Sequence, residues 1–591
     1  MRSTSIITGR TFVLLILAAS FVVGHDSNHG HMNQEVDMSK GNSTSASPSP
    51  HDFPPNYFRH PGYPGWMYAH IALMMLSWVA VLPAATMLSI ARSRYSLAAQ
   101  MVFHAFNGAG MVTGFVYSRA TPDLYTGDAH GLIGYVVNSL TVIWTLATTL
   151  ATLKTSKSTQ TGFAGSHAAL RHDIPQYAQL QQYEDSPVEY HSSRDSGNFS
   201  SGSRGSSLSE SRKEEETPAL PPSDESYTDE HNGDIKKTFL GNGLVGHFLA
   251  RNTARFVGQR IFAVARVGQV MLDKLLLLLG FAAVTSGFVV YGGIFRSREI
   301  FSGMAHFVKG AIFFWYGILT LGRWMGAFSK YGWAWNIRST VSHTSRWQSR
   351  VPSAEFTESF VIWLYGATNV WAEHLNAWGK AWSAQDFEHV SITILFFGGG
   401  LLGMIIESGW IGRMLNTGVE VRKSENTSEV QEPGLALLDE SDVTPPARKM
   451  SVNPMPALVI MLLGMMMSSH HQSSMVATML HAQWGMLFSG FALARGLTYI
   501  LMYLKPPTTA YPSRPPTELV ASFCLMSGGV LFMNSSHDGV RSIEFNGLDA
   551  MTIFTLTMGM TGVLMAWEVV CYALMGWAVR REAGVREAIE S

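Results

Sequence analysis

Histidine is the residue type whose placement in this chain could support chemistry. When the apolar segments are threaded through a membrane, nearly all the membrane-embedded and juxtamembrane histidines fall at one, non-cytosolic face. They are His70, His130, His306, His374, His389, His470, His471, His481 and His537. Imidazole is the commonest metal ligand and titrates near physiological pH, and polar residues inside a bilayer are costly and often functional. This layer is therefore the first place to look for a reactive centre.

His70 and His130 form the sharpest pair in that layer. Each enters its apolar segment from the non-cytosolic side, so an antiparallel packing of the first three segments can bring both to one depth. Two facing imidazoles that fill both axial positions of an iron make a b-type haem site suited to electron transfer. A second haem at His104, nearer the cytosolic side, would need a partner, and the fourth segment has no histidine. The alternative is that these histidines cap helix ends at the membrane interface.

The same segments carry a residue pattern that resembles a known family. The pattern is His70, Met75, Trp78, Leu82-Pro83, Phe103-His104 and His130-Gly131. It resembles the ascorbate-reducible transmembrane cytochrome b family over about residues 60–155. The resemblance implies a haem b held by histidines of this set, His70, His130 and His104. The fourth histidine of that family has no clear counterpart here, which puts transfer between two haems in doubt.

A second candidate metal site lies in the C-terminal half, where His470, His471 and His481 stand near Met475 and Met479. Thioether and imidazole together suit Cu(I) or haem iron, so copper is a candidate cofactor beside haem b. Met475 and Met479 share a helix face, whereas His481 points elsewhere, so one helix cannot gather the whole set. The alternative is that these methionines fill irregular helix contacts.

Several ionisable residues lie inside apolar segments. Glu407 and Glu568 lie toward the cytosolic halves of their segments, and Arg495 lies at a similar depth in a third. An Arg–Glu pair among them would neutralise the charge inside the bundle, and the functional alternative is a proton or ion path. Lys309 shares a helix face with His306, and two potential cations there need a partner.

Membrane helices must position all of these residues. Of 591 residues, 47% are hydrophobic and only 14% are charged, whereas soluble globular chains carry about 25% charged residues. The net charge of −1 leaves no nucleic-acid footprint, and the two cysteines lie in apolar segments, which argues against a disulfide framework. The fold class is therefore all-α, a polytopic transmembrane helical bundle of about eleven spans after a signal peptide. The expected spans are 66–90, 97–118, 130–152, 269–294, 302–322, 356–373, 388–411, 454–470, 474–503, 517–534 and 547–578.

Loop charge predicts the orientation. Lys and Arg gather in alternate loops, for example 323–350 and 505–514, whereas the opposite loops are short and poor in both. Because positive loops stay cytosolic, we expect an extracytosolic N-terminus and a cytosolic C-terminus. The N-terminal signal predicts the secretory pathway, in the plasma membrane, endoplasmic reticulum or vacuole, with a retained signal anchor as the alternative.

Polar stretches divide the chain into regions. The Ser-rich and acidic insert is expected to be disordered, cytosolic and open to phosphorylation. Within the membrane part, Gly398-Gly399-Gly400 and Gly403 are expected to let two helices approach closely. The regions are a signal peptide (1–24), an extracytosolic His-rich disordered segment (25–64), a three-helix cytochrome-b-like membrane domain (65–153), the insert (154–240), a C-terminal membrane domain (241–578) with a polar cytosolic loop (414–453), and a cytosolic tail (579–591).

Motifs of the C-terminal half resemble a second family. They include Ser468-Ser469-His470-His471-Gln472, His481-Ala482-Gln483-Trp484-Gly485, Ala494-Arg495-Gly496, Pro515-Pro516-Thr517-Glu518 and Ala566-Trp567-Glu568. They are similar to the fungal YTP-type integral membrane proteins, which join an N-terminal domain of unknown function to this C-terminal domain. The resemblance implies a multispanning membrane protein described as transporter-like, with a loose similarity to electron-transport proteins. It supplies no substrate and no catalytic residue.

The leading functional hypothesis is a haem-b or redox-metal membrane protein linked to electron transfer. One alternative is a metal- or proton-coupled transporter that uses Glu407, Arg495 and Glu568. The other is a non-catalytic membrane organiser regulated through the insert. All three act within a lipid bilayer and without nucleic acid. No nucleophile elbow, Walker motif or protease signature is present, so the sequence leaves open whether the protein is an enzyme, and which small molecule or ion it handles.

Overall fold

The computed structural model describes residues 53–161, 259–296, 299–338, 351–374, 384–418, 452–469 and 474–590, together with Trp382 and Gln472. The expected signal peptide, nearly all of the insert and residues 419–451 of the polar loop lie outside these residues, as do His470 and His471.

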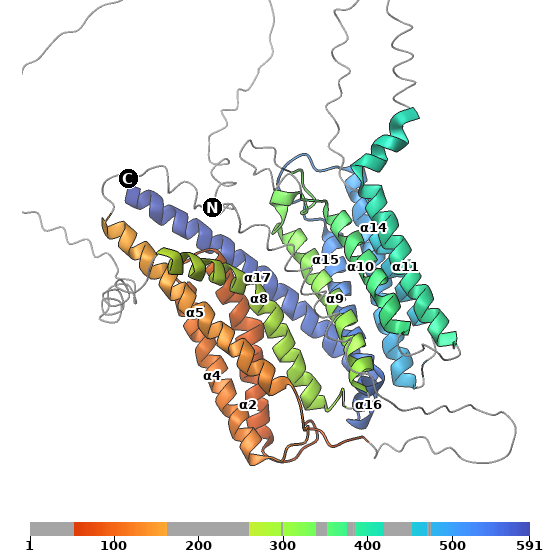
Figure 1. The fold of residues 1–591 in the computed structure, drawn as a ribbon, viewed down its shortest axis with the longest axis horizontal. Coiled ribbons are helices and arrows are strands. Elements are labelled where there is room, and N and C mark those ends of the chain that lie inside the picture. Colours follow the sequence, from red (N-terminus) through yellow and green to blue (C-terminus); the bar gives the residue numbers. More distant parts are fainter. Residues whose placement is uncertain are drawn as a thin grey trace, which may run out of the picture. The chain divides into compact units, whose positions relative to one another are not determined.

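Helices make up all the regular structure in the described ranges, which confirms the all-α class (Figure 1). They are α2 (Pro64–Met75), the π-helix η2 (Leu76–Val81), α3 (Leu82–Ile90), α4 (Ser96–Ala120), α5 (His130–Thr161), α8 (Gln259–Gly292), α9 (Glu299–Met325), the 3₁₀ turn η4 (Ser329–Tyr331), α10 (Ala354–His374), α11 (Ala384–Glu407), α13 (Met455–Ser468), α14 (Met475–Leu504), α15 (Pro516–Asn534), α16 (His537–Phe545) and α17 (Ala550–Glu590).

Eight helices of the described residues are long and apolar enough to cross a membrane, so the expected count of eleven spans is not confirmed. The three remaining expected spans are helices too, but they fall short in composition or length. Helix α4 carries Gln100, His104 and Asn107, α10 carries Glu355 and Glu358, and α13 has only 14 residues. These three helices pack on neighbouring helices. Their own apolar stretches are too short or too polar to meet the requirement for a membrane span.

Segment edges differ from expectation at both ends of the chain. Residues 53–63 belong to the expected disordered segment, yet Phe53 and Asn56 are only 7% and 2% exposed. The aromatic ring of Phe53 packs on Phe545, and Asn56 donates to the carbonyl of Gly292. Local aromatic content therefore outweighs the polar composition of the longer stretch. At the other end, α17 continues through the expected tail to Glu590.

The chain divides into two compact units. The first comprises residues 1–145 and 270–578, and it holds every candidate site residue that the structure describes. The second comprises residues 146–269 and 579–591, whose described parts are the end of α5, the start of α8 and the end of α17.

Within the first unit, a proline shapes the first span. Pro83 lacks an amide N–H and cannot complete the regular helical ladder, and the preceding turn is the π-helix η2. Its Trp78 is buried and donates to Asn107 of α4, which in turn donates to Asn138 of α5. These polar contacts join the first span to α4 and α5 inside an apolar core that also contains Phe103 and Trp144. A satisfied polar chain in such a core fixes the register of the helices.

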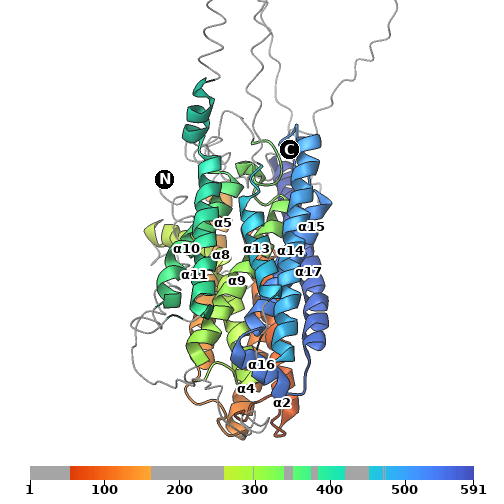
Figure 2. The same cartoon turned by 90° about the vertical axis from the view of Figure 1, so that its right-hand side faces the viewer.

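In the C-terminal half, α9, α10, α11, α13, α14 and α15 pack side by side (Figure 2). Glycine pairs let the helix backbones touch. The pairs are Gly310 with Gly529 between α9 and α15, and Gly464 with Gly485 between α13 and α14; between α10 and α11, Gly366 lies against the backbone of Phe397 and Gly400 against that of Trp363. Close approach through small residues is the usual basis of helix association in membranes. The expected role of the Gly398–Gly403 run is confirmed for Gly399, Gly400 and Gly403, whereas a Cβ on Gly398 would meet nothing within 4 Å.

Gly398 and Gly400 of α11, two positions apart, provide a matched test of the close helix contact. A Cβ at Gly400 would overlap the backbone nitrogen of Trp363, so Gly400→Ala is expected to lower the free energy of unfolding by about 1–3 kcal/mol. Gly398→Ala adds its methyl group to open space and is expected to be neutral or stabilising by up to about 1 kcal/mol, through helix propensity. Denaturation of both variants in detergent micelles measures the difference, and equal effects would contradict the close helix contact.

Candidate functional site

His70 and His130 lie next to each other in the first unit. His70 is on α2 and His130 is the first residue of α5, as the expected hairpin requires. Their ring centroids are 6.5 Å apart, and the ring planes stand at 80°. Two residues separated by sixty positions thus present imidazoles to one small volume.

Hydrogen bonds identify Nδ1 as a donor on both His70 and His130. His70 Nδ1 lies 2.7 Å from the carbonyl oxygen of Gly110, which can only accept, so Nδ1 is the donor. His130 Nδ1 lies 2.9 Å from Ser286 Oγ, whose own proton goes to the carbonyl of Ala283 at 2.8 Å. Ser286 therefore accepts from His130. A ring that donates from Nδ1 presents Nε2 as the atom that a metal would take, and such anchoring by the surroundings is usual for metal-binding histidines.

Glycines make room for the two rings. A Cβ on Gly114 of α4 would lie 2.6 Å from His70 Nδ1, and one on Gly287 of α8 would lie 3.1 Å from His130 Cε1. The rings therefore occupy space that any side chain at these positions would fill. Four helices, α2, α4, α5 and α8, converge on the pair.

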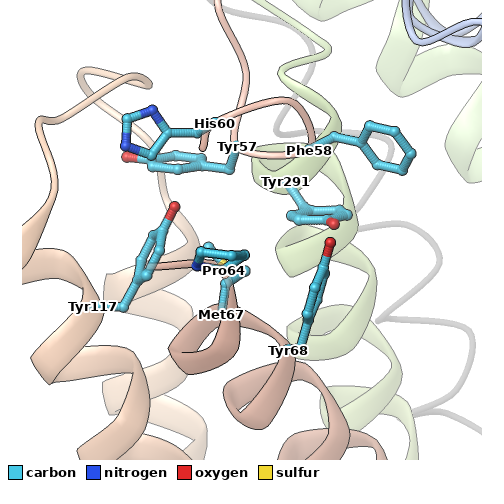
Figure 3. A pocket seen from close by; sticks show the side chains of 8 residues that line it. All are labelled: Tyr57, Phe58, His60, Pro64, Met67, Tyr68, Tyr117 and Tyr291. Carbon is cyan, nitrogen blue, oxygen red and sulfur yellow. The ribbon is translucent and has the colours of Figure 1, made fainter. Parts of the chain in front are cut away.

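A small pocket lies one helical turn from the pair. It has a volume of about 10 Å³ and is lined by Tyr57, Phe58, His60, Pro64, Met67, Tyr68, Tyr117 and Tyr291 (Figure 3). Met67, Tyr117 and Tyr291 stand three or four residues from His70, Gly114 and Gly287, respectively, so each helix runs from the pair directly to the pocket. One turn of helix is about 5 Å.

Tyrosine hydroxyls dominate this pocket. In Figure 3 the hydroxyls of Tyr68 and Tyr291 point toward one another. The amide of Leu124 donates to the hydroxyl oxygen of Tyr57 at 3.1 Å. Burial raises the pKa of Tyr57, so the hydroxyl stays protonated and can donate in turn. The pocket therefore offers hydrogen-bonding groups around a volume that suits one water molecule.

His104 is held in a different way. Its Nε2 lies 2.8 Å from Thr145 Oγ1, whose proton goes to the carbonyl of Thr141 at 3.1 Å, so Nε2 is the donor. The nitrogen that a haem iron would take is thus engaged with a neighbouring helix. A second haem centred on His104 gains no support from this arrangement.

The second candidate site is a row of five buried charges in the C-terminal half. Arg323 donates to Glu355 at 2.8 Å and to Glu358 at 2.6 Å. Arg495 contacts Glu358 at 3.1 Å and Glu518 at 2.8 Å. The order is therefore Glu355, Arg323, Glu358, Arg495 and Glu518, with Glu358 shared between the two guanidinium groups. We call these five residues the charge row.

Helix ends and one loop position the charge row. Arg323 lies in the last turn of α9, whereas Glu355 and Glu518 lie in the first turns of α10 and α15. The charges of these three residues are therefore favourable at their helix ends. Interaction with the helix dipole stabilises each by about 0.3–1 kcal/mol, and by up to about 2 kcal/mol when the group is partly buried. The indole of Trp335 covers both guanidinium groups, 4.4 Å from Arg323 and 5.3 Å from Arg495.

The row is closed off from solvent. Arg495 and Glu518 are fully buried, and Glu355, Glu358 and Arg323 are at most 7% exposed. Moving a charge out of water costs several kcal/mol, so five charges here need near-complete mutual pairing. Among the residues that the structure describes, the pairing is incomplete at one end, because Arg495 Nη2 and Glu518 Oε2 have no hydrogen-bond partner there.

This arrangement corrects the expected partners of Arg495. The sequence suggested a pair with Glu407 or Glu568, but Arg495 pairs with Glu358 and Glu518. Glu407 instead accepts from Ser353 at 2.8 Å. Glu568 is partly buried near Cys571, and Lys309 is partly buried on α9.

The sequence interpretation missed Arg323 as a buried group and missed the three glutamates. Arg323 was counted among loop charges, and the glutamates stand at helix starts, where solvated acidic residues are common. One signal was available. The run Pro515-Pro516-Thr517-Glu518 begins a helix whose following residues are all apolar or small, so its acidic first turn faces a buried neighbour.

The proposed C-terminal metal site is only partly described. His481 is buried, its Nδ1 lies 2.8 Å from the carbonyl of Ala477 and its ring packs on Trp484. Met475 and Met479 are exposed, at 74% and 41%. Across the described ranges, no group of three or more His, Cys, Asp or Glu side chains is placed to hold a metal ion.

Apolar spans, glycine-mediated helix contacts and a buried charge row define an integral membrane protein of the multispanning helical class. The chain belongs to the YTP1-like family. The family description "Protein YTP1-like, C-terminal" matches residues 279–576, and "Domain of unknown function (DUF2427)" matches residues 51–154. This confirms the resemblance seen in the C-terminal motifs.

Fungal relatives extend this assignment. An uncharacterized membrane protein of Schizosaccharomyces pombe is 33% identical over 553 residues, which cover 91% of this chain and 99% of the relative. An uncharacterized membrane protein of Saccharomyces cerevisiae is 35% identical over 55% of this chain and 51% of its own length. Protein YTP1 of the same yeast is 22% identical over 51% of this chain and 52% of its own length. No solved structure matches the chain.

Proposed function

We propose that this protein is a membrane electron-transfer protein that holds the iron of a b-type haem between His70 and His130. The observation that carries the proposal is that Nδ1 of each ring lies against a protein acceptor, the carbonyl of Gly110 for His70 and Ser286 Oγ for His130, so that Nε2 is the atom a metal would take on both rings. Anchoring of Nδ1 in this way is the usual support of a metal-binding histidine. Histidines that only cap helix ends would not require both rings to be anchored through the same nitrogen.

The spacing of the rings supports the proposal. A bond of about 2 Å from a metal to each imidazole nitrogen, plus about 1 Å from nitrogen to ring centre on each side, gives about 6 Å between centroids. The observed separation is 6.5 Å. The centroid separation is therefore close to the one that a metal atom bound by both rings would need. A haem iron with two imidazole ligands supplies reversible one-electron transfer.

The surrounding residues would serve that chemistry by orientation and access. Gly110 and Ser286 hold the two rings, and the tyrosine pocket leads from the pair toward the chain segment before α2. The hydroxyls of this pocket would orient a water molecule between the pair and that segment. His104 has its Nε2 engaged by Thr145, so we propose one haem rather than two.

The proposed orientation follows from loop charge, with the pair and its pocket at the extracytosolic face and the C-terminus in the cytosol. We propose a membrane of the secretory pathway as the location. Electrons would then pass between the pocket side and partners at the same face, because a single haem near one face does not bridge the bilayer.

An absorption spectrum tests the proposal. Full-length protein purified in detergent from haem-supplemented cells is expected to show a Soret band and, after dithionite reduction, the sharp α-band of a low-spin haem. The pyridine assay should then give a single haem b per chain. Protein without a Soret band and without haem in that assay would overturn the proposal, and copper found by metal analysis would replace haem with a copper ion at the same pair.

A further inference from the structure

Arg495 is the guanidinium group of the charge row whose hydrogen bonding is incomplete. Its Nε donates to Glu518 at 2.8 Å, and its Nη1 donates to Glu358 at 3.1 Å. Within the described part of the chain, Nη2 has no acceptor, although Arg495 is 0% exposed. A buried donor without an acceptor costs free energy, and the cost is larger when the group is charged. This N–H group is therefore buried and still requires an acceptor.

Two tyrosine hydroxyls near Arg495 are in the same condition. The ring of Tyr316 packs on Phe491 with the centroids 5.6 Å apart, and Arg495 Cζ lies 5.4 Å from the ring of Phe491. The ring of Tyr499 packs on Trp335 at 5.9 Å, and Arg495 Cζ lies 5.3 Å from the ring of Trp335. Both tyrosines interact electrostatically with Arg495. Their hydroxyls are buried and have no hydrogen-bond partner in the described ranges.

The ligand that completes these groups has to be small and neutral. Arg495 Nη2 can only donate, whereas a tyrosine hydroxyl can donate and accept, so the ligand needs both capacities. The charge row already contains three carboxylates against two guanidinium groups, and an anion would add to that excess. A cation would lie against the guanidinium group of Arg495. Water meets every condition, and one water joins heavy atoms about 5–6 Å apart, since each of its hydrogen bonds spans about 2.7–3.0 Å.

The indole of Trp335 covers this site and contributes a further polar group. Its ring lies 4.4 Å from Arg323 Cζ but 5.3 Å from Arg495 Cζ. Its Nε1 is also buried, and the residues of known position supply no acceptor for it. Ser513 donates to the carbonyl of Trp335, and the neighbouring Asn336 donates to the carbonyl of Ala510 at 2.6 Å. The loop before α15 therefore holds the indole in place beside Arg495.

We infer that the charge row contains a binding site for ordered water, held by Arg495 Nη2 and the hydroxyls of Tyr316 and Tyr499 and covered by Trp335. Buried water typically makes about three hydrogen bonds to polar groups that otherwise lack partners. Here it completes the hydrogen bonding of Arg495, which favours the burial of the row. The inference is independent of the haem proposal, because the charge row and the histidine pair share no residue.

Hydroxyl-radical labelling of the full-length protein in detergent tests the inference. X-ray radiolysis generates radicals from bound water as well as from bulk water, whereas peroxide photolysis generates them in the bulk solvent. In ¹⁸O water, Trp335 is expected to gain the ¹⁸O label under X-rays and to stay unlabelled under photolysis. Trp144 is the matched control, because it is 0% exposed and its Nε1 donates to Asp273 at 2.7 Å, so it should stay unlabelled under both. Tyr511 is exposed and should be labelled under both.

A double variant tests whether the two hydroxyls hold the water. Tyr316→Phe with Tyr499→Phe keeps both rings and is expected to lose the label of Trp335 under X-rays. Three results would overturn the inference. Trp335 of the wild type stays unlabelled by either method, which indicates a dry site. Trp335 is labelled by both methods, which indicates a loop that opens to solvent. The label persists undiminished in the double variant, which indicates water held elsewhere.

A cryo-electron microscopy map that resolves water gives an independent readout. Density is expected at a hydrogen-bond distance of about 2.7–3.2 Å from Arg495 Nη2. A direct contact from Nη2 to a protein acceptor, with no such density, would contradict the inference.

Discussion

His70→Ala and His130→Ala are each expected to remove the haem from the purified protein. Either change deletes one of the two imidazoles that would hold the proposed haem iron, whose ring centroids lie 6.5 Å apart. The remaining ring cannot hold a low-spin iron by itself. We expect the ratio of haem to protein to fall at least about 10-fold, since loss of even a supporting partner costs about 10- to 100-fold in metal affinity. The pyridine assay, normalised to protein, measures it.

Two controls separate ligand loss from general damage. His104→Ala removes an imidazole bonded to Thr145 and is expected to keep the full haem content. Ser286→Ala removes the acceptor of His130 Nδ1 while leaving both ligands, and is expected to give an intermediate loss and a shifted reduction potential. Equal haem content in His70→Ala, His130→Ala and the wild type would show that the pair binds no haem.

Arg495→Met is expected to cause the largest loss of stability in the C-terminal half. It removes the guanidinium group that contacts Glu358 and Glu518, and it leaves both carboxyl groups buried with fewer partners. Breaking a buried pair from one side costs about 3–5 kcal/mol. Arg514→Met is the matched control, because Arg514 is exposed and substitutions at such sites usually stay within about 0.5 kcal/mol.

A double variant identifies the cause of the loss. Arg495→Met with Glu518→Gln removes both members of the Arg495–Glu518 contact, so part of the lost free energy of unfolding should return. Denaturation of the four proteins in the same detergent supplies the cycle. A double variant no more stable than Arg495→Met alone would indicate that packing against Trp335 and Phe491, rather than charge, is what Arg495 contributes.

The proximity of His70 and His130 could be predicted from the sequence. Two histidines that enter helices from the same side of a membrane must lie at one depth, and a short hairpin brings those helices together. The structure places the rings 6.5 Å apart, as that argument expects. The hydrogen-bond partners of the two Nδ1 atoms could not be predicted from the sequence. Gly110 and Ser286 approach the rings from α4 and α8 only in the folded bundle.

The ion pairs of the charge row could not be predicted from the sequence. Glu358 and Glu518 are separated by 160 positions, and both resemble the solvated acidic residues that commonly begin helices. Arg323 likewise resembles a cytosolic loop charge. Charge and position along the chain do not reveal burial at a helix end, which depends on the loop that folds over it, here the one carrying Trp335.

By itself, the sequence determined that this is an all-helical, multispanning membrane protein. Apolar length and helix-compatible glycines are local properties of each segment, and the bilayer acts on each segment separately. Only the tertiary structure decided which ionisable groups are buried, which partners they have and which acceptors lie against Nδ1 of His70 and His130. Those outcomes arise from contacts between α2, α4, α5 and α8, and between α9, α10, α14 and α15, whose residues are far apart in the chain. Electrostatic energies depend on burial and distance, and both exist only once the helices have packed.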